Sequence, residues 1–447
     1  MNVAFVRSYW RMAHAASPQN HKIGSIVQRW WAQARTSFFW MFGIAFVLRL
    51  TLIILGHTYK FKPYDNGFSF GWEMGRIGRA IAAGQGFANP FDGQTGPTAW
   101  EPPLYPYLIG SVFRLAGVYT HGSAFILLSI NSIFSALTCI PIFLIARKCF
   151  SEKVAVWTAW AWALLPSVMY WCTRWVWETS LAALLLALIF WLTLKMEELE
   201  GIVPWIGFGV LWGVAGLTNT SLLAFLPASG LWAVYKQRKR GVPAVAGATL
   251  AGIFFCATIA PWLVRNFEVF GRPVFIRSNF GAELRLGNGP GANGTWMSYV
   301  HPSQNVVELR RYEHLGEIGY VAKRKREAVE FIRQDVARFA WLSVKRFIYY
   351  WGGLPRSSEI PALAPFKNSL FLASSVLAFW GLGRALRKRQ YGAWLFFWLI
   401  LSYPTIYYFV FPHPRYRHPI EPELGILIVY LISEAKLGRP QALQKAI

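Results

Sequence analysis

Residues 38–56 read FFWMFGIAFVLRLTLIILG, an apolar run interrupted by a single charged residue, Arg49. A helix of about 20 apolar residues crosses the roughly 30 Å hydrocarbon core of a bilayer. Comparable apolar runs recur from Phe38 almost to the C-terminus. The sequence therefore predicts an all-α polytopic membrane protein, a bundle of about ten or more transmembrane helices.

The composition supports the membrane class and argues against a soluble protein that binds nucleic acid. The 447 residues are 55% hydrophobic and only 15% charged, whereas soluble domains carry roughly 25% charge. The formal net charge of +24 would indicate a nucleic-acid partner in a soluble protein. Because the apolar spans argue against that class, we expect no nucleic acid and expect lipid phosphates as partners of the basic residues.

Short basic loops remain on the cytoplasmic side of a membrane, and this rule orients the chain. It places both termini inside and makes 102–118 an interfacial or re-entrant helix, since a crossing there would put Arg147 and Lys148 outside. The candidate spans are 37–57, 122–146, 153–170, 176–195, 202–218, 219–235, 244–264, 367–386, 391–411 and 417–434. The expected division is a basic cytoplasmic arm (1–36), a first transmembrane helix that is an uncleaved signal anchor (37–57), a first outer loop with interfacial helices (58–121), six transmembrane helices (122–264), a second large outer loop (265–366), three transmembrane helices (367–434) and a cytoplasmic tail (435–447).

The first outer loop holds an acidic residue on an amphipathic pattern. Phe70, Met74, Ile77 and Ile81 follow helical spacing, which predicts a helix of about four turns on the membrane surface. Glu73 lies on this helix with Arg76 three positions later. A positioned carboxylate of this kind suits a general base, and an ordinary surface ion pair with Arg76 is the alternative.

Ionisable residues also gather at the outer ends of other spans. Glu178 lies where a charge is costly and therefore suggests function, with an ion pair to Arg174 as the alternative. The sequence HPRYRH (413–418) concentrates cations whose guanidinium forks match phosphate oxygens. Plain interfacial anchoring is the other reading of that cluster. Arg265 and Asn266 present the same choice.

Several longer stretches resemble one family. They are GWEMGRIGRAIAAGQGFANPF (71–91), PTAWEPPLYPYLIGSVFRLAG (97–117), PWLVRNFEVFGRPVFIRSNFGAELRLGNGPGANGT (261–295) and PRYRHPIEPEL (414–424). They are similar to the outer-loop motifs of GT-C-fold membrane glycosyltransferases, the group of protein O-mannosyltransferases and lipid A aminoarabinose transferases. This resemblance implies a GT-C-like fold in a bacterial inner membrane. It also implies inverting transfer of a sugar, hexosyl or pentosyl, from a polyprenyl-phosphate carrier to an acceptor at the outer face.

The resemblance also implies roles for particular residues. A first-loop carboxylate is the catalytic base in that group, often as an Asp; Glu73 stands here after Trp72, which leaves open whether Asp65 shares the role. Basic residues bind the carrier phosphate, and the candidates are Arg76, Arg265, His413, Arg415 and Arg417. Further site candidates are Glu101, Glu178, Asn266 and Asn288. We expect no obligatory metal or other cofactor, membrane lipids as partners, and a protein, lipid or glycan acceptor bound by 265–366.

Two other functions fit a polytopic chain of this kind. A ligase or polymerase of lipid-linked glycans would rely on the second loop, through His301, Arg310, Arg311 and His314. It would not need a carboxylate on a first-loop helix. A transporter or flippase would place polar residues and broken helices near the midplane, often in two repeated halves. No such repeat is visible, and the polar residues gather at the outer ends of spans.

Overall fold

The computed structural model describes residues 33–62, 67–355 and 364–437. Within these ranges the chain is helical and has no strand, and one isolated antiparallel bridge pairs Ala88 with Pro97. The prediction of an all-α membrane protein is confirmed. Asp65, most of the predicted N-terminal arm and part of the predicted C-terminal tail lie outside the described residues.

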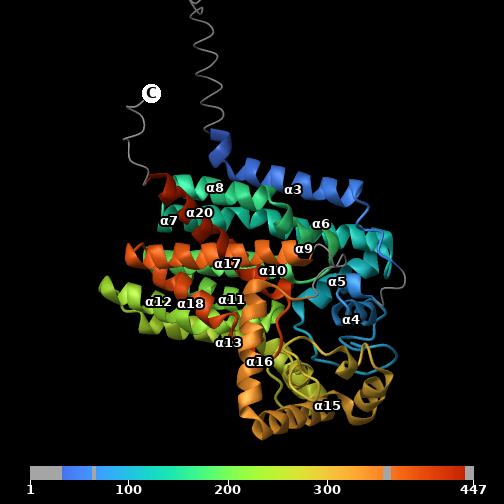
Figure 1. Ribbon diagram of the computed structural model, residues 1–447. Helices are drawn as coiled ribbons and strands as arrows, with labels where there is room; N and C mark the ends of the chain where they lie inside the picture. The colour runs from blue at the N-terminus through green and yellow to red at the C-terminus, as the bar shows by residue number, and fades with distance from the viewer. Residues whose placement is uncertain (1–32, 63–66, 356–363, 438–447) are drawn as a thin grey trace, which may run out of the picture.

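Most of the helices run side by side and form a bundle (Figure 1). Its members are α3 (Phe38–Leu55), α6 (His121–Leu137), α7 (Cys139–Cys149), α8 (Glu152–Leu164), α9 (Pro166–Arg174), α10 (Thr179–Lys195), α11 (Val203–Thr218), α12 (Leu226–Lys239), α13 (Val245–Phe270), α17 (Ala364–Arg387), α18 (Ala393–Ser402) and α20 (Glu421–Leu437). Among the described residues, four segments are long and apolar enough to cross a membrane: Phe38–Leu55, His121–Cys149, Val245–Phe270 and Ala364–Arg387. The count of ten or more spans therefore stays a prediction.

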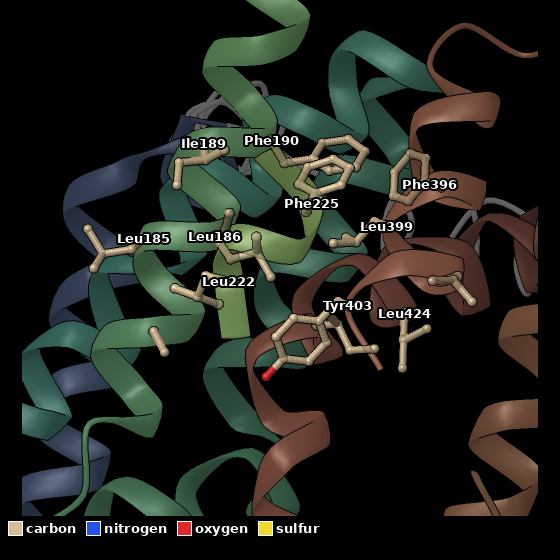
Figure 2. Close-up of a cluster of buried hydrophobic side chains, with 14 of the residues drawn as sticks. Leu185, Leu186, Ile189, Phe190, Leu222, Phe225, Phe396, Leu399, Tyr403 and Leu424 are labelled. Atoms are coloured by element: carbon tan, nitrogen blue, oxygen red, sulfur yellow. The ribbon is translucent and has the colours of Figure 1, made fainter. Parts of the chain in front are cut away.

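Helix α10 lies at the centre of the bundle and is apolar on all sides, as expected for a helix surrounded by others. Leu185, Leu186, Ile189 and Phe190 of α10 are all buried. They meet residues of the 3-10 helix η2 (Thr220–Phe225), α18 and α20, among them Phe225, Phe396, Leu399 and Leu424 (Figure 2). This packing holds α10 against η2, and residues at the start of both, Glu178, Thr220 and Ser221, line the site described below.

Five further helices lie at one end of the bundle. They are α4 (Glu73–Ala82), α5 (Leu104–Ala116), α14 (Phe280–Gly287), α15 (Val306–Gln334) and α16 (Val336–Gly352), the last of which runs across the direction of the bundle helices (Figure 1). They come from 58–121 and 265–366, the two segments predicted as outer loops. These two segments, about 200 positions apart in sequence, therefore pack against each other.

The predicted surface helix of the first loop differs from expectation. Only Glu73–Ala82 is α-helical, preceded by the 3-10 turn Phe68–Phe70. The stripe of Phe70, Met74 and Ile77 is buried inside the protein and does not face lipid. The reason is α5: a Cβ added at Gly78 would come within 2.6 Å of Ile109 of α5, so glycine lets the two helices approach closely. Since α5 has only 13 residues, it spans about 20 Å and is too short to cross a bilayer alone.

Candidate active site

A cavity of about 320 Å³ opens where the first loop, α14, η2 and the segment around α19 (Thr405–Phe409) meet. Its lining combines ionisable and aromatic side chains. The ionisable ones are Glu73, Glu101, Glu178, Glu283, Arg277, Arg415, His301 and His413. The aromatic ones are Phe68, Trp72, Trp100, Trp177, Phe280, Trp296, Tyr407, Phe411 and Tyr416. Such a mixture suits a ligand that has both polar and apolar parts.

Glu73 is the first residue of α4, where the free N–H groups of the helix favour a negative charge. Glu73 is buried, with 5% of its surface exposed to solvent. Ser303 Oγ donates a hydrogen bond to Glu73 Oε1 at 3.2 Å, and His301 Nε2 lies 3.4 Å from the same oxygen. Within the described part of the chain Oε2 receives no hydrogen bond. One carboxylate oxygen is thus held by the protein, and the other is left for a substrate.

The imidazole of His301 is held in one tautomer. The backbone N–H of Ser303 donates to His301 Nδ1 at 3.2 Å, so in the neutral ring the hydrogen lies on Nε2, which faces Glu73. Burial lowers the pKa of His301 despite the opposing charge of Glu73, and the charge of Arg76 acts in the same direction as burial. The ring also stacks on Trp72, with centroids 5.5 Å apart and planes 12° apart. A neutral imidazole therefore orients the carboxylate without neutralising it.

Arg76 supports the carboxylate of Glu73 indirectly, through Ser303. Its Nε and Nη2 donate to the two oxygens of Asp92 at 3.1 and 3.4 Å, and its Nη1 donates to Ser303 Oγ at 3.1 Å. The i,i+3 ion pair between Glu73 and Arg76, considered from the sequence, does not form. Ser303 instead links the two side chains, since its hydroxyl accepts from Arg76 and donates to Glu73. Arg76 is a support of the carboxylate, and it does not line the cavity.

The backbone just before Glu73 is strained. Trp72 has φ 49° and ψ −108°, a conformation that residues with a Cβ rarely adopt. Gly71 before it has φ 84°, and a Cβ there would come within 2.5 Å of the Val176 carbonyl oxygen. Strained residues of this kind cluster at functional sites, where the surroundings hold them in place. The turn directs both Trp72 and Glu73 to the cavity.

Arg415 supplies a cation to the same cavity. Its guanidinium lies over the Trp177 ring, 3.5 Å from the centroid, and its Nη2 donates to the Tyr416 hydroxyl at 3.4 Å. Among the described residues it forms no ion pair with a carboxylate. Burial and the charge of Arg415 lower the pKa of His413, also in the cavity, to about 3, so this imidazole is neutral. Arg415 is therefore available to an anionic ligand.

The other cation of the lining, Arg277, is engaged by carboxyls. Its Nη2 lies 3.4 Å from Glu101 Oε1 and 3.9 Å from Glu283 Oε1. Burial raises the pKa of Glu101 to about 8 despite the opposing charge of Arg277. Burial also raises the pKa of Glu283, against the charges of Arg277 and Arg415.

Glu178, predicted from its place at the end of a span, lines the cavity beside these groups. Asn219 Nδ2 donates to its Oε1 at 3.1 Å. The alternative pairing with Arg174 does not form, because Arg174 is exposed and lies over the Tyr170 ring.

Four predicted residues lie elsewhere and have structural partners. Arg265 donates to the carbonyl oxygens of Thr98 and Phe87 at 2.6 and 2.8 Å. Arg417 is buried and donates to Glu421 at 2.5 Å, to Ser375 and to Ser374. Asn266 bonds the carbonyl groups of Val274 and Ile276, and Asn288 those of Leu284 and Phe409. None of the four lines the cavity, because each side chain satisfies buried backbone or side-chain groups instead.

The structure also brings in residues that sequence reasoning did not place in this site. Arg277, Glu283 and Ser303 carried no prediction, and His301 was considered only for a ligase. The stretch 261–295 contained a signal for two of them, since Arg277 and Glu283 lie inside the motif that resembles the family. Of the other ligase candidates, Arg310, Arg311 and His314 are exposed on α15 and do not line the cavity. Across the described ranges no group of three or more His, Cys, Asp and Glu side chains is arranged to hold a metal ion.

Comparison with known proteins agrees with this architecture. Residues 100–264 match the family described as dolichyl-phosphate-mannose-protein mannosyltransferase. The archaeal oligosaccharyltransferase AglB from Archaeoglobus fulgidus, solved with an inhibitory peptide and a dolichol-phosphate, superposes with a TM-score of 0.51 at 14% identity, over 93% of this chain and 52% of AglB. ArnT from Cupriavidus metallidurans bound to undecaprenyl phosphate gives a TM-score of 0.33 at 11% identity, over 85% of this chain and 76% of ArnT. No curated protein matches the sequence.

These findings show the fold of the chain. The chain has the fold of the GT-C membrane glycosyltransferases, and the resemblance indicated by the sequence motifs is confirmed. It spans about half the length of the archaeal enzyme.

Proposed function

We propose that this protein is an inverting glycosyltransferase that moves one sugar from a polyprenyl-phosphate carrier to an acceptor hydroxyl at the outer face of a bacterial inner membrane. The observation that supports it best is one cavity that holds both Glu73, with a free carboxylate oxygen, and Arg415, with no carboxylate partner in the described chain. Inverting transfer needs a base and an anion-stabilising group on opposite sides of the reacting carbon. The neighbours AglB and ArnT were solved with dolichol-phosphate and undecaprenyl phosphate.

In this proposal Glu73 Oε2 accepts the proton of the acceptor hydroxyl as its oxygen attacks the anomeric carbon. Ser303 and His301 hold Oε1, so the carboxylate meets the substrate in one orientation. The bond from the anomeric carbon to the phosphate oxygen breaks as the new bond forms. Negative charge then develops on the leaving phosphate, where the fixed guanidinium of Arg415 stabilises it.

The aromatic and apolar side chains of the lining suit the sugar and the lipid chain of the donor. Trp72, Trp100 and Trp296 lie near His301 and Glu73, where sugar rings stack well on flat aromatic faces. The cavity is also lined by Ile406, Val410 and Phe411, which belong to or follow α19 and form an apolar wall. Phe411 contacts the ring of Tyr416, whose hydroxyl accepts from Arg415. We assign that wall to the first isoprene units of the carrier.

The ligase reading is not carried further, because three of its four residues are exposed on α15. The proposal is tested with purified protein in nanodiscs, a panel of polyprenyl-phosphate hexoses and pentoses, and membrane extract as a source of acceptors. Transfer of label with inversion at the anomeric carbon, followed by NMR, is expected for one donor. Retention of configuration, or no transfer from any lipid-phosphate donor, contradicts it.

A further inference from the structure

The cavity contains more acidic than basic side chains. Glu73, Glu101, Glu178 and Glu283 face only Arg277 and Arg415, which gives a formal charge of −2 with every carboxyl ionised. The imidazoles of His301 and His413 do not offset this, since burial lowers the pKa of both. A phosphate would add further negative charge in a site where like charges repel strongly. Neutralisation of one of these carboxyls therefore favours the binding of an anion.

The ion pairs of Arg277 show which carboxyls hold a cation of the cavity. Glu101 and Glu283 share a single nitrogen of Arg277, at 3.4 and 3.9 Å. The same guanidinium donates through Nε to the Trp100 carbonyl oxygen at 3.3 Å, which fixes its position on the wall. Arg277 and Arg415 line the same cavity, and the charges of both oppose the rise in the pKa of Glu283. Arg277 thus lines the cavity that also holds Arg415, and Glu101 is the nearer of the two carboxyls on its Nη2.

We propose, on the basis of the function proposed above, that Arg277 is a second ligand of the carrier phosphate and that protonation of Glu101 releases it for this contact. A proton from solvent binds the Glu101 carboxylate, whose hold on the guanidinium weakens. The freed N–H groups of Arg277 then donate to a phosphate oxygen beside Arg415. Binding of the anion thus depends on the protonation of Glu101, and it takes up one proton where Glu101 is ionised in the free protein.

Every charge around Glu101 enters this equilibrium. Arg277 and Arg415 favour its ionised form, whereas Glu73, Glu178 and Glu283 favour the protonated form. Because burial raises the pKa of Glu101 to about 8, the empty site already carries the proton below pH 8. Above pH 8 the proton has to be taken up on binding, so affinity falls by up to tenfold per pH unit.

The test uses farnesyl methyl phosphate, a phosphodiester that keeps one negative charge across the pH range. Its Kd for the protein in nanodiscs is measured by calorimetry from pH 6.5 to 9.5, in EDTA so that no metal supplies positive charge. We expect a constant Kd below pH 8 and a rising Kd above it. Titrations at pH 9 in two buffers of different ionisation enthalpy should show uptake of close to one proton.

Three variants separate the contributions of Glu101, Glu178 and Arg277 to anion binding. Glu101→Gln keeps a neutral side chain of the same shape, so it should bind with the low-pH affinity of the wild type at every pH. Glu178→Gln, a matched change to a cavity carboxyl that bonds Asn219 and not an arginine, should keep the alkaline weakening. Its midpoint should move to lower pH, since Glu178 is one of the charges that favour protonation of Glu101. Arg277→Gln should weaken binding roughly 10- to 100-fold, the scale of a charged hydrogen bond.

The outcomes distinguish this inference from the function on which it rests. Absence of binding to the wild type at any pH would count against the proposed function. Binding with a Kd that does not change between pH 7 and 9.5, or wild-type affinity in a folded Arg277→Gln variant, would overturn the inference alone. Retention of the alkaline weakening in Glu101→Gln would assign the proton to another carboxyl and would equally overturn it.

Discussion

Ser303 donates a hydrogen bond to Glu73 across 3.2 Å, although the two residues are 230 positions apart in the sequence. This contact joins the predicted first outer loop to the second. The same hydroxyl accepts from Arg76, so one serine connects the proposed base to the Arg76–Asp92 ion pair. The base is therefore positioned by the second segment, and changes in either segment should affect turnover.

Glu73→Gln preserves shape but removes the proton acceptor. We expect kcat to fall by 10²–10⁴-fold, the usual contribution of a general base, with little change in donor affinity. Glu73→Asp should keep partial activity. Turnover with a purified donor is the measurement, and Asp65→Asn is made in parallel. Full activity of Glu73→Gln together with loss in Asp65→Asn would transfer the role to Asp65.

Ser303→Ala removes the link between Glu73 and Arg76. A neutral hydrogen bond contributes about 0.5–1.5 kcal/mol, so kcat should fall roughly twofold to tenfold while KM for the donor stays constant. Ser298→Ala is the matched control, since Ser298 lies five positions earlier and is exposed. An equal loss in both variants would indicate a general disturbance of this segment and not a loss of carboxylate orientation.

The two arginines of the PRYRHP sequence should behave differently. Arg415→Ala should weaken binding of polyprenyl phosphate by roughly 1.5–3 kcal/mol, and Arg415→Lys should restore it only in part, because lysine lacks the planar fork. Arg417→Ala should leave lipid affinity unchanged and lower stability by roughly 1–3 kcal/mol, since Glu421, Ser374 and Ser375 lose their donor. Titration calorimetry and thermal unfolding check the pair. The reverse pattern would move the phosphate site to Arg417.

The orientation of the chain gives a separate prediction. Cysteines introduced at Gln94 and Gln304, both exposed and both in the segments that form the site, should react with a membrane-impermeant thiol reagent from outside. A cysteine at Gln390 should react only after permeabilisation. Mass-tag gel shifts report the labelling, and protection of position 94 in intact cells would invert the proposed topology.

Metal dependence is tested by chelation. We expect turnover to be unchanged after dialysis against EDTA, because in our proposal Arg415 stabilises the leaving phosphate. Loss of activity that added Mg²⁺ or Mn²⁺ restores would show that the cavity carboxyls hold a cation during catalysis.

Local patterns in the sequence determined the fold class of this protein and several residues of the candidate site. Apolar runs can be satisfied in a bilayer only as helices, so the all-α membrane class followed from 38–56 and its repetitions. Motif resemblance around 71–117 and 414–424 indicated the GT-C fold. The amphipathic pattern around Glu73, the place of Glu178 at the end of a span and the cationic cluster that contains Arg415 marked three residues that line the cavity.

Tertiary structure decided what each charged side chain does. Arg265, Arg415 and Arg417 have the same chemistry and similar positions at the ends of spans. Yet Arg265 satisfies backbone carbonyls, Arg417 pairs with Glu421, and only Arg415 faces the cavity. The role of a guanidinium depends on the acceptors that lie within about 3 Å of it. For Arg265 those acceptors are 167 and 178 positions away, and for Glu73 the orienting serine is 230 positions away. No local pattern encodes such separations, because the packing of 58–121 against 265–366 sets them.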